Sequence, residues 1–217
     1  TIVAKQLKDF KIEVDTLIEN KKLKKDEAIF NVLREYIKAS KKIRFEGNGY
    51  GEEWEIEAVK RGLSNNKTTP EALKEKKSKK TIALFEEMGV MSKIETEARH
   101  EIELEEYILR IQIEGRVLGD IARNHIIPTA IKYQNTLIEN VSGLKNIFGS
   151  GFEKHAKEQI DLIEKISMHI SGINSKVEEM TEERKKANLI HGQEAADAYC
   201  YAVKPYFGQI RHHCDKL

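Results

Sequence analysis

Carboxylate and imidazole side chains are the groups in this sequence with a spacing that could do chemistry. Glu97 and His100 have the Glu-x-x-His spacing with which di-iron and di-manganese helical bundles hold their metals. Such a site needs a second copy of the motif and two further inward-facing glutamates. Glu153 and His155 are one residue too close together to supply that copy. A chance match in a glutamate-rich chain is therefore the favoured interpretation, with a di-metal enzyme as its rival.

The other histidines and the two cysteines have no evident catalytic partners. His125 lies among isoleucines, where a hydrogen-bonded core or interface role is more common than catalysis. His212 and His213 could bind a metal, but no paired cysteine or acid completes a site. Cys200 and Cys214 fall in one predicted helical region, which predicts free thiols in a reducing cytosol. We find no catalytic triad, nucleophile elbow or zinc motif.

A glycine-rich loop is the one candidate for a phosphate cradle. Gly47, Gly49 and Gly51 alternate with other residues and allow unusual backbone angles. The dinucleotide fingerprint requires G-x-G-x-x-G within a βαβ unit, and neither the spacing nor the context fits. No Walker lysine follows either. The sequence therefore favours a structured loop on which Tyr50 and the only tryptophan, Trp54, pack.

Charge and composition exclude several classes of protein. The 217 residues include 37 basic and 36 acidic side chains, a net charge of +1, so the basic surplus of a dedicated nucleic-acid binder is missing. Only three prolines and 13 glycines argue against an all-β fold or a disordered chain. No apolar run is long enough to cross a bilayer. We expect neither a nucleic-acid nor a membrane partner.

One long helical pattern, from Ser92 to Val141, organises the chain. Ser92 and Glu95 have capping-box spacing, and apolar residues then recur at steps of three and four. A helix of this length spans about 70 Å. An element that long cannot lie inside a small globule, so other helices must cover its apolar stripe.

The rest of the chain is also predicted to be helical. A seam with heptad spacing in Phe152–Ala187 predicts an antiparallel hairpin with the long helix, joined by a turn between Ser142 and Gly151. Further helices are predicted at Ile2–Glu19, Asp26–Ser40, Glu52–Arg61 before Gly62, Glu71–Lys77 with Thr69 as cap, Lys79–Met88 with Ser78 as cap, and Glu194–Leu217 with a kink at Pro205.

These elements predict an all-α fold. We expect an elongated helical bundle built on one long helix and an antiparallel hairpin, with a short extended glycine-rich loop near residues 43–51. Residues 1–91 hold the N-terminal helices and that loop, and residues 92–217 hold the hairpin and the last helix. The two parts are expected to form one continuous helical domain. From the residues alone, the chain is a helical interaction or scaffolding domain.

Several segments, in order along the chain, resemble the C-terminal helical region of type III glutamine synthetase. The first runs from Ile43 to Leu63 and includes Phe45, Gly47, Asn48, Gly49, Tyr50 and Trp54. Lys79-Lys80, Ala83-Leu84-Phe85 and Gly89-Val90 make the second. The third and most specific contains Arg99, Glu101, His125, Pro128, Tyr133 and Gln134. The fourth contains Tyr199, Cys200, Lys204, Pro205, Tyr206 and Phe207 and runs to Leu217.

The resemblance implies a large cytoplasmic enzyme that joins ammonia to glutamate, using ATP and Mg²⁺ or Mn²⁺ through a γ-glutamyl phosphate. It also implies a ring-stacked homo-oligomer in which this region contacts the parent catalytic domain and neighbouring subunits. The family's catalytic residues lie upstream, so the resemblance assigns no catalytic, cofactor-binding or metal residue here, and the matched positions are expected to be structural. The start at Thr1 without methionine suggests an excised fragment, whose aromatic residues Phe45, Tyr50 and Trp54 should lie outside its own core.

Two interpretations of function follow. In the first, the chain is a non-catalytic fragment of a type III glutamine synthetase that contributes to subunit packing or regulation. In the second, it is a stand-alone helical adaptor whose isoleucine-rich seam docks partner helices.

Overall fold

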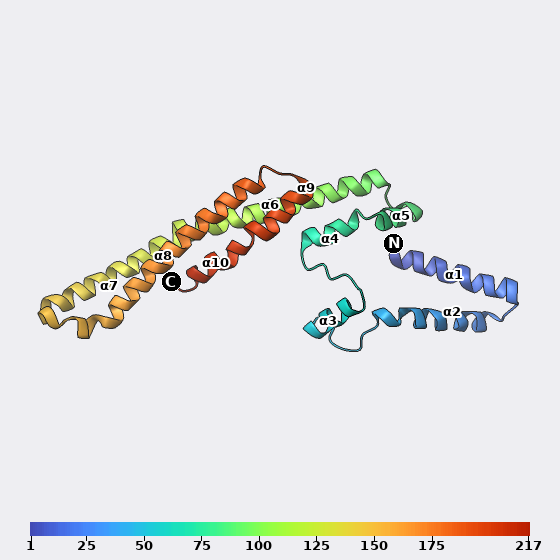
Figure 1. The fold of residues 1–217 in the computed structure, drawn as a ribbon, viewed down its shortest axis with the longest axis horizontal. Coiled ribbons are helices and arrows are strands. Elements are labelled where there is room, and N and C mark those ends of the chain that lie inside the picture. The colour runs from blue at the N-terminus through green and yellow to red at the C-terminus, as the bar shows by residue number, and fades with distance from the viewer. The chain divides into compact units, whose positions relative to one another are not determined.

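The computed structural model describes all residues from 1 to 217 and contains helices and turns but no strand, which confirms the predicted all-α class. Figure 1 shows the order of the helices. The chain divides into two compact units, Thr1–His100 (unit 1) and Glu101–Leu217 (unit 2). Each unit is described by itself below.

Unit 1 begins with a helical hairpin. Helices α1 (Ile2–Lys21) and α2 (Lys25–Ala39) pack through buried Val14, Ala28 and Val32, as the apolar periodicity predicted. Lys22 adopts a left-handed backbone conformation, with φ of 51°, and ends α1. The Phe10 and Tyr36 rings meet edge to face across the hairpin, with centroids 5.7 Å apart.

The remainder of unit 1 consists of short helices. A 3₁₀ turn, η1 (Ser40–Ile43), precedes the glycine-rich loop, and α3 (Glu52–Lys60), α4 (Thr69–Lys76) and α5 (Lys79–Glu87) follow. Two sequence-based predictions need correction. Ile43 ends the 3₁₀ turn and is not extended. The cap of α4 is Thr68 and not Thr69, because only Thr68 lies three residues before Glu71 and so completes a capping box.

The predicted long helix is present and longer than expected. Helix α6 (Lys93–Ile121), the π-helical segment η2 (Ala122–Ile126) and α7 (Ile127–Phe148) follow without a break. The Ser92–Glu95 capping box forms as predicted. Pro128 has no N–H for the helical ladder, and the π segment accommodates that interruption. Ser142 and Gly143 were predicted to lie in a turn but belong to α7, and the turn itself, η3, is only Gly149–Gly151.

The hairpin with heptad spacing is confirmed. Helix α8 (Glu153–Ala187) runs back beside α7 (Figure 1), and Ala156, Ile166, Ile173, Val177 and Met180 of its seam are buried. The chain ends with α9 (Gly192–Ala198), a second π-helical segment η4 (Tyr199–Val203) and α10 (Pro205–Cys214). Tyr199, Val203 and Ile210 are fully buried against α8 and complete the core of unit 2.

Candidate functional site

The glycine-rich loop forms a small aromatic cluster within unit 1. The rings of Phe45 and Trp54 lie 4.7 Å apart, and the Arg61 guanidinium sits 5.6 Å from the Trp54 ring centroid. A Cβ on Gly47 would lie 2.6 Å from the Phe45 ring, so any other residue at this position would displace the ring. Both aromatic residues remain half-buried outside the hydrophobic core.

Two further loop residues have different roles. The Asn48 side-chain oxygen accepts a hydrogen bond from the Tyr50 N–H at 3.0 Å, an Asx turn that shapes the loop. The Tyr50 side chain is fully exposed. Gly49 has open space around it. The close approach of Gly47 to Phe45 and the Asx turn at Asn48 account for the shape of the loop without a phosphate-binding role.

The Glu97–His100 motif does not assemble into a metal centre. His100 is buried. Its sequence neighbours Arg99 and Glu101, which belong to the third segment of the family resemblance, are exposed. Nowhere in residues 1–217 do three or more histidine, cysteine, aspartate or glutamate side chains come together in a way that could hold a metal ion.

His125 and Tyr133 line a shallow hollow and are not core residues. Both side chains are exposed, and Cys214 and Leu217 from the end of the chain line the same hollow. The prediction of a core position for His125 was therefore wrong, whereas an interface role for it stays a prediction. Pro128, close by in sequence, is exposed at the start of α7.

Gln134 connects the two helices of the hairpin. Its side-chain NH₂ group donates to the Ile163 carbonyl at 3.0 Å and to the Ser167 hydroxyl at 2.7 Å. In the last segment, the Lys176 ammonium lies 5.9 Å from the Tyr206 ring centroid, while Lys204 and Pro205 are exposed. Gln134 and Tyr206 thus make contacts with α8, whereas a structural role for Lys204 and Pro205 stays a prediction.

Both cysteines are free thiols, as predicted. Cys200 is buried in η4, and Cys214 is half-buried at the end of α10. Burial raises the pKa of the Cys214 thiol, with a smaller contribution from the negative charge of Asp215. A raised pKa disfavours the reactive thiolate, so neither the position nor the acidity of Cys214 suits a nucleophile.

A histidine cluster joins α8 to α10, and the sequence pattern did not reveal it. The Nδ1 atoms of His169 and His213 lie 3.0 Å apart, and the His212 ring is 5.5 Å from the His213 ring. Burial lowers the pKa of His169, and the positive charges of His213, His212 and Lys216 lower it further. The lowered pKa disfavours the protonated form of His169.

Gly172 makes room for this cluster. A Cβ at Gly172 would lie 2.5 Å from His213 Cε1, so the His213 ring rests directly on the α8 backbone. Glycine inside a helix costs about 1 kcal/mol relative to alanine. The close approach of the ring explains why the middle of α8 carries this residue.

A polar network around the buried Tyr199 closes the other end of unit 2. The Tyr199 hydroxyl donates to the Asn188 side-chain oxygen at 2.6 Å, and the Gln112 side-chain NH₂ group donates to the same oxygen at 3.2 Å. The network joins α6, the end of α8 and η4. Burial raises the pKa of Tyr199, so its hydroxyl stays protonated as a donor. Helical periodicity places Tyr199 on an apolar face but does not identify its partner.

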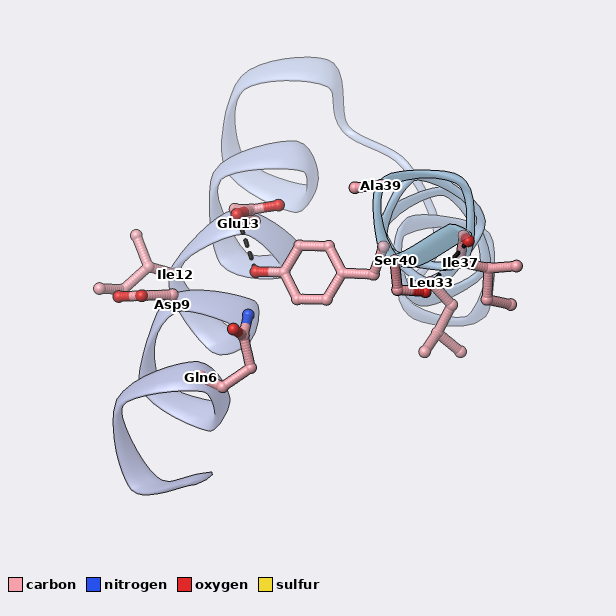
Figure 2. Close-up of a pocket in the computed structure, with 9 residues that line it drawn as sticks. Gln6, Asp9, Ile12, Glu13, Leu33, Ile37, Ala39 and Ser40 are labelled. Carbon is pink, nitrogen blue, oxygen red and sulfur yellow. Dashed lines mark hydrogen bonds between the residues drawn. The ribbon is translucent and has the colours of Figure 1, made fainter. Parts of the chain in front are cut away.

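An open groove lies between α1 and α2 (Figure 2). Its lining consists of Gln6, Asp9, Ile12 and Glu13 from α1, of Leu33, Tyr36, Ile37 and Ala39 from α2, and of Ser40 at the start of η1. The Tyr36 hydroxyl donates to Glu13 at 2.9 Å (dashed in Figure 2), and burial followed by this bond raises the pKa of Tyr36. The lining includes two carboxylates and no basic side chain, so the groove is unsuited to phosphate or carboxylate ligands.

Helices held together by packing and by side-chain hydrogen bonds define an all-α domain. The chain belongs to the glutamine synthetase C-terminal domain family, whose model matches residues 28–145. It is 45% identical over 217 residues to a glutamine synthetase from Bacteroides fragilis, covering 99% of this chain and 30% of that protein.

Two other curated proteins are similar. A type-3 glutamine synthetase from Dictyostelium discoideum is 29% identical over 222 residues, covering 100% of this chain and 30% of that protein. A glutamine synthetase from Butyrivibrio fibrisolvens is 29% identical over 190 residues, or 88% of this chain and 27% of that protein. The chain thus spans about 30% of the length of the curated relatives it matches. No helix of the chain combines the length and apolar character that a membrane span needs.

Proposed function

We propose that this chain is the helical C-terminal part of a type III glutamine synthetase and that it acts in subunit packing or regulation, not in catalysis. The similarity to the Bacteroides fragilis glutamine synthetase over 99% of the chain carries this proposal, and the Dictyostelium discoideum relative supports the type. The parent would be a cytoplasmic homo-oligomer that joins ammonia to glutamate with ATP and Mg²⁺ or Mn²⁺.

A second apolar face on α6 supports a packing role. Each residue turns the helix by about 100°, so Ile102, Leu109, Ile113 and Val117 fall on the face opposite buried Leu104 and Ile111. The four exposed residues are between 48% and 54% accessible. An exposed apolar stripe of this kind is typical of a protein interaction site. We expect the catalytic domain or a neighbouring subunit to cover it.

An activity assay on residues 1–217 tests the non-catalytic part of the proposal. We expect no ATP-dependent glutamine formation from glutamate and ammonia with Mg²⁺ or Mn²⁺ present. The full-length enzyme assayed in parallel is the positive control. Turnover by residues 1–217 alone would refute the assignment.

Substitution on the exposed face of α6 tests the packing role. In the full-length enzyme, Leu109→Lys with Val117→Lys should shift the sedimentation profile toward smaller species, because two charges would enter an apolar contact. Glu182→Lys with Lys185→Glu is the control, since it exchanges charges in an exposed ion pair on α8, away from this face of α6. Equal profiles for wild type and the lysine variant would show that this face is not an interface.

The adaptor hypothesis keeps one supporting observation, the exposed apolar stripe itself, because a partner helix could cover it. The reading frame that encodes the chain separates the two proposals. An in-frame glutamine synthetase catalytic domain ahead of Thr1 would exclude a stand-alone adaptor, and its absence would exclude the first proposal.

A further inference from the structure

A basic hollow lies between the end of α2 and the start of the glycine-rich loop. Its lining contains five cationic side chains and one carboxylate: Lys38, Lys41, Lys42, Arg44 and Arg61 against Glu46, with Ala39 and Phe45 completing the wall. Its volume of about 840 Å³ falls within the range of small-ligand sites. In a chain with a net charge of +1, this is a local concentration of positive charge.

Arg61 holds the wall of the hollow in place. Its Nη1 donates to the backbone carbonyls of Arg44 at 2.7 Å and Lys42 at 3.3 Å, and its Nε donates to Glu57 at 2.7 Å. The segment that carries Lys42 and Arg44 is thereby tied to α3. Arg44 in turn donates from Nη2 to the Ile37 carbonyl at 3.0 Å, which ties it to the end of α2. Such fixed geometry reduces the entropy lost when a ligand binds.

Three of the five cations are available for a ligand. Lys38 pairs with Glu35 at 3.0 Å, and Arg61 pairs with Glu57. Lys41 and Lys42 form no ion pair in the structure, and Arg44 engages a neutral carbonyl. Gly62, with φ of 69°, lies beside the Lys42 ammonium, since a Cβ there would be in ordinary van der Waals contact with Nζ at 3.6 Å. Only Glu46 opposes these three charges within the lining.

The end of α2 does not cancel this charge. A helix C-terminus carries roughly half a negative charge, against a surplus of two from Lys41, Lys42 and Arg44 over Glu46. Lysine ammonium groups and the arginine fork are the side chains that bind phosphate oxygens. Several separate cations around one hollow suit a ligand with several anionic groups better than a single phosphate.

We propose that the hollow formed by Lys41, Lys42 and Arg44, with Arg61 as the positioning residue, binds a small molecule that carries a di- or triphosphate group. The ligand would be a nucleotide or an inorganic oligophosphate, and both share the same recognised chemistry. Phe45 is the one aromatic side chain in the lining, and a nucleotide base would pack against it. The proposal rests on residues of unit 1 alone and does not depend on the glutamine synthetase assignment.

The intrinsic fluorescence of Trp54 can report this binding. It is the only tryptophan, and it contacts both Phe45 and Arg61, which line the hollow. Pyrophosphate, tripolyphosphate, ATP and orthophosphate are titrated into residues 1–217 at constant ionic strength, followed by Trp54 fluorescence and by calorimetry. We expect saturable binding of the first three with an affinity at least about tenfold tighter than for orthophosphate, and weaker binding as salt is added.

A charge-neutralising variant and a matched control make the test specific. Lys41→Gln with Lys42→Gln and Arg44→Gln should raise the Kd for tripolyphosphate by at least about tenfold, or about 1.4 kcal/mol. The control removes three charges from the exposed basic turn of the same unit, with Lys21→Gln, Lys22→Gln and Lys24→Gln, and should leave the Kd within about twofold of wild type. Circular dichroism verifies that both variants fold, since all six side chains are exposed.

These measurements distinguish specific binding in the hollow from nonspecific electrostatic attraction of the anion to exposed lysines. Equal binding of ATP and tripolyphosphate, or tighter binding of ATP, supports the proposal, the second result adding a base contact on Phe45. The proposal fails if none of the oligophosphates binds at millimolar concentration. It also fails if the control triple variant loses as much affinity as the triple variant at the hollow.

Discussion

Replacing Tyr199 with phenylalanine should remove one partly buried hydrogen bond and little else. The ring is fully buried in the core of unit 2, so Phe keeps its packing and creates no cavity. The lost bond is the 2.6 Å contact from the hydroxyl to the Asn188 oxygen, which keeps its second donor, Gln112. Because the acceptor remains paired, we expect a loss of about 0.5–1.5 kcal/mol in unfolding free energy.

The comparison with Tyr199→Ala sets the scale. That substitution also removes the ring and leaves a cavity among buried residues, for which about 3–5 kcal/mol is expected. Asn188→Ala combined with Tyr199→Phe completes a double-mutant cycle, and the two changes should be less than additive because they remove the same bond.

Urea unfolding followed by circular dichroism, with hydrogen exchange of α9 and η4, measures these effects. Trp54 lies in unit 1 and Tyr199 in unit 2, so the tryptophan fluorescence transition should not move and is an internal control. Equal losses for Tyr199→Phe and Tyr199→Ala would refute the reasoning, because the hydrogen bond would then outweigh the packing of the ring. Strict additivity in the cycle would show that the bond does not contribute.

Three further predictions concern the histidine cluster and the caps. Gly172→Ala should displace the His213 ring and raise the pKa of His169 toward its ordinary value, as measured by NMR titration. Stability should change by less than about 1 kcal/mol, because alanine's helix propensity offsets the lost contact; an unchanged pKa would contradict the contact. Because the pKa of His169 is lowered on folding, the unfolded state binds more protons as the pH falls below about 6.5. The stability of unit 2 should therefore decrease from there down to the lowered pKa. His169→Gln should flatten this part of the urea-midpoint profile, and a midpoint that rises on acidification would be incompatible with the lowered pKa. Thr68→Ala should destabilise unit 1 by about 1 kcal/mol in tryptophan-monitored unfolding, whereas Thr69→Ala should cost much less; a larger effect at Thr69 would place the cap there.

Local patterns predicted the helices well because each depends on residues near in sequence. The Ser92–Glu95 spacing, the Ser78 cap and the seam from Ala156 to Met180 were all found as predicted. The errors were also local. Pro205 predicted a kink, and the long helix was predicted to run on past Pro128. At both prolines the helix continues through a π segment, which needs hydrogen-bond geometry that residue types do not specify.

The candidate sites were less predictable. The basic hollow combines residues from α2, η1 and α3, and only its separate lysines and arginines are visible in the sequence. The family-like positions near Phe45 and Gln134 could be found by resemblance, but their proposed structural role remains a prediction. Their contacts, such as Gln134 with Ile163 and Ser167, could not be found by pattern.

The amino-acid sequence by itself determined the all-α class, the order of the helices and the free thiols, because periodicity, capping and cysteine spacing are properties of short segments. Only the tertiary structure decided that His169 meets His213 over Gly172, that Tyr199 bonds Asn188, and that Arg61 holds the wall of a basic hollow. Each of these contacts joins residues on different elements. The packing of those elements depends on how whole helical faces fit together, which no local spacing specifies.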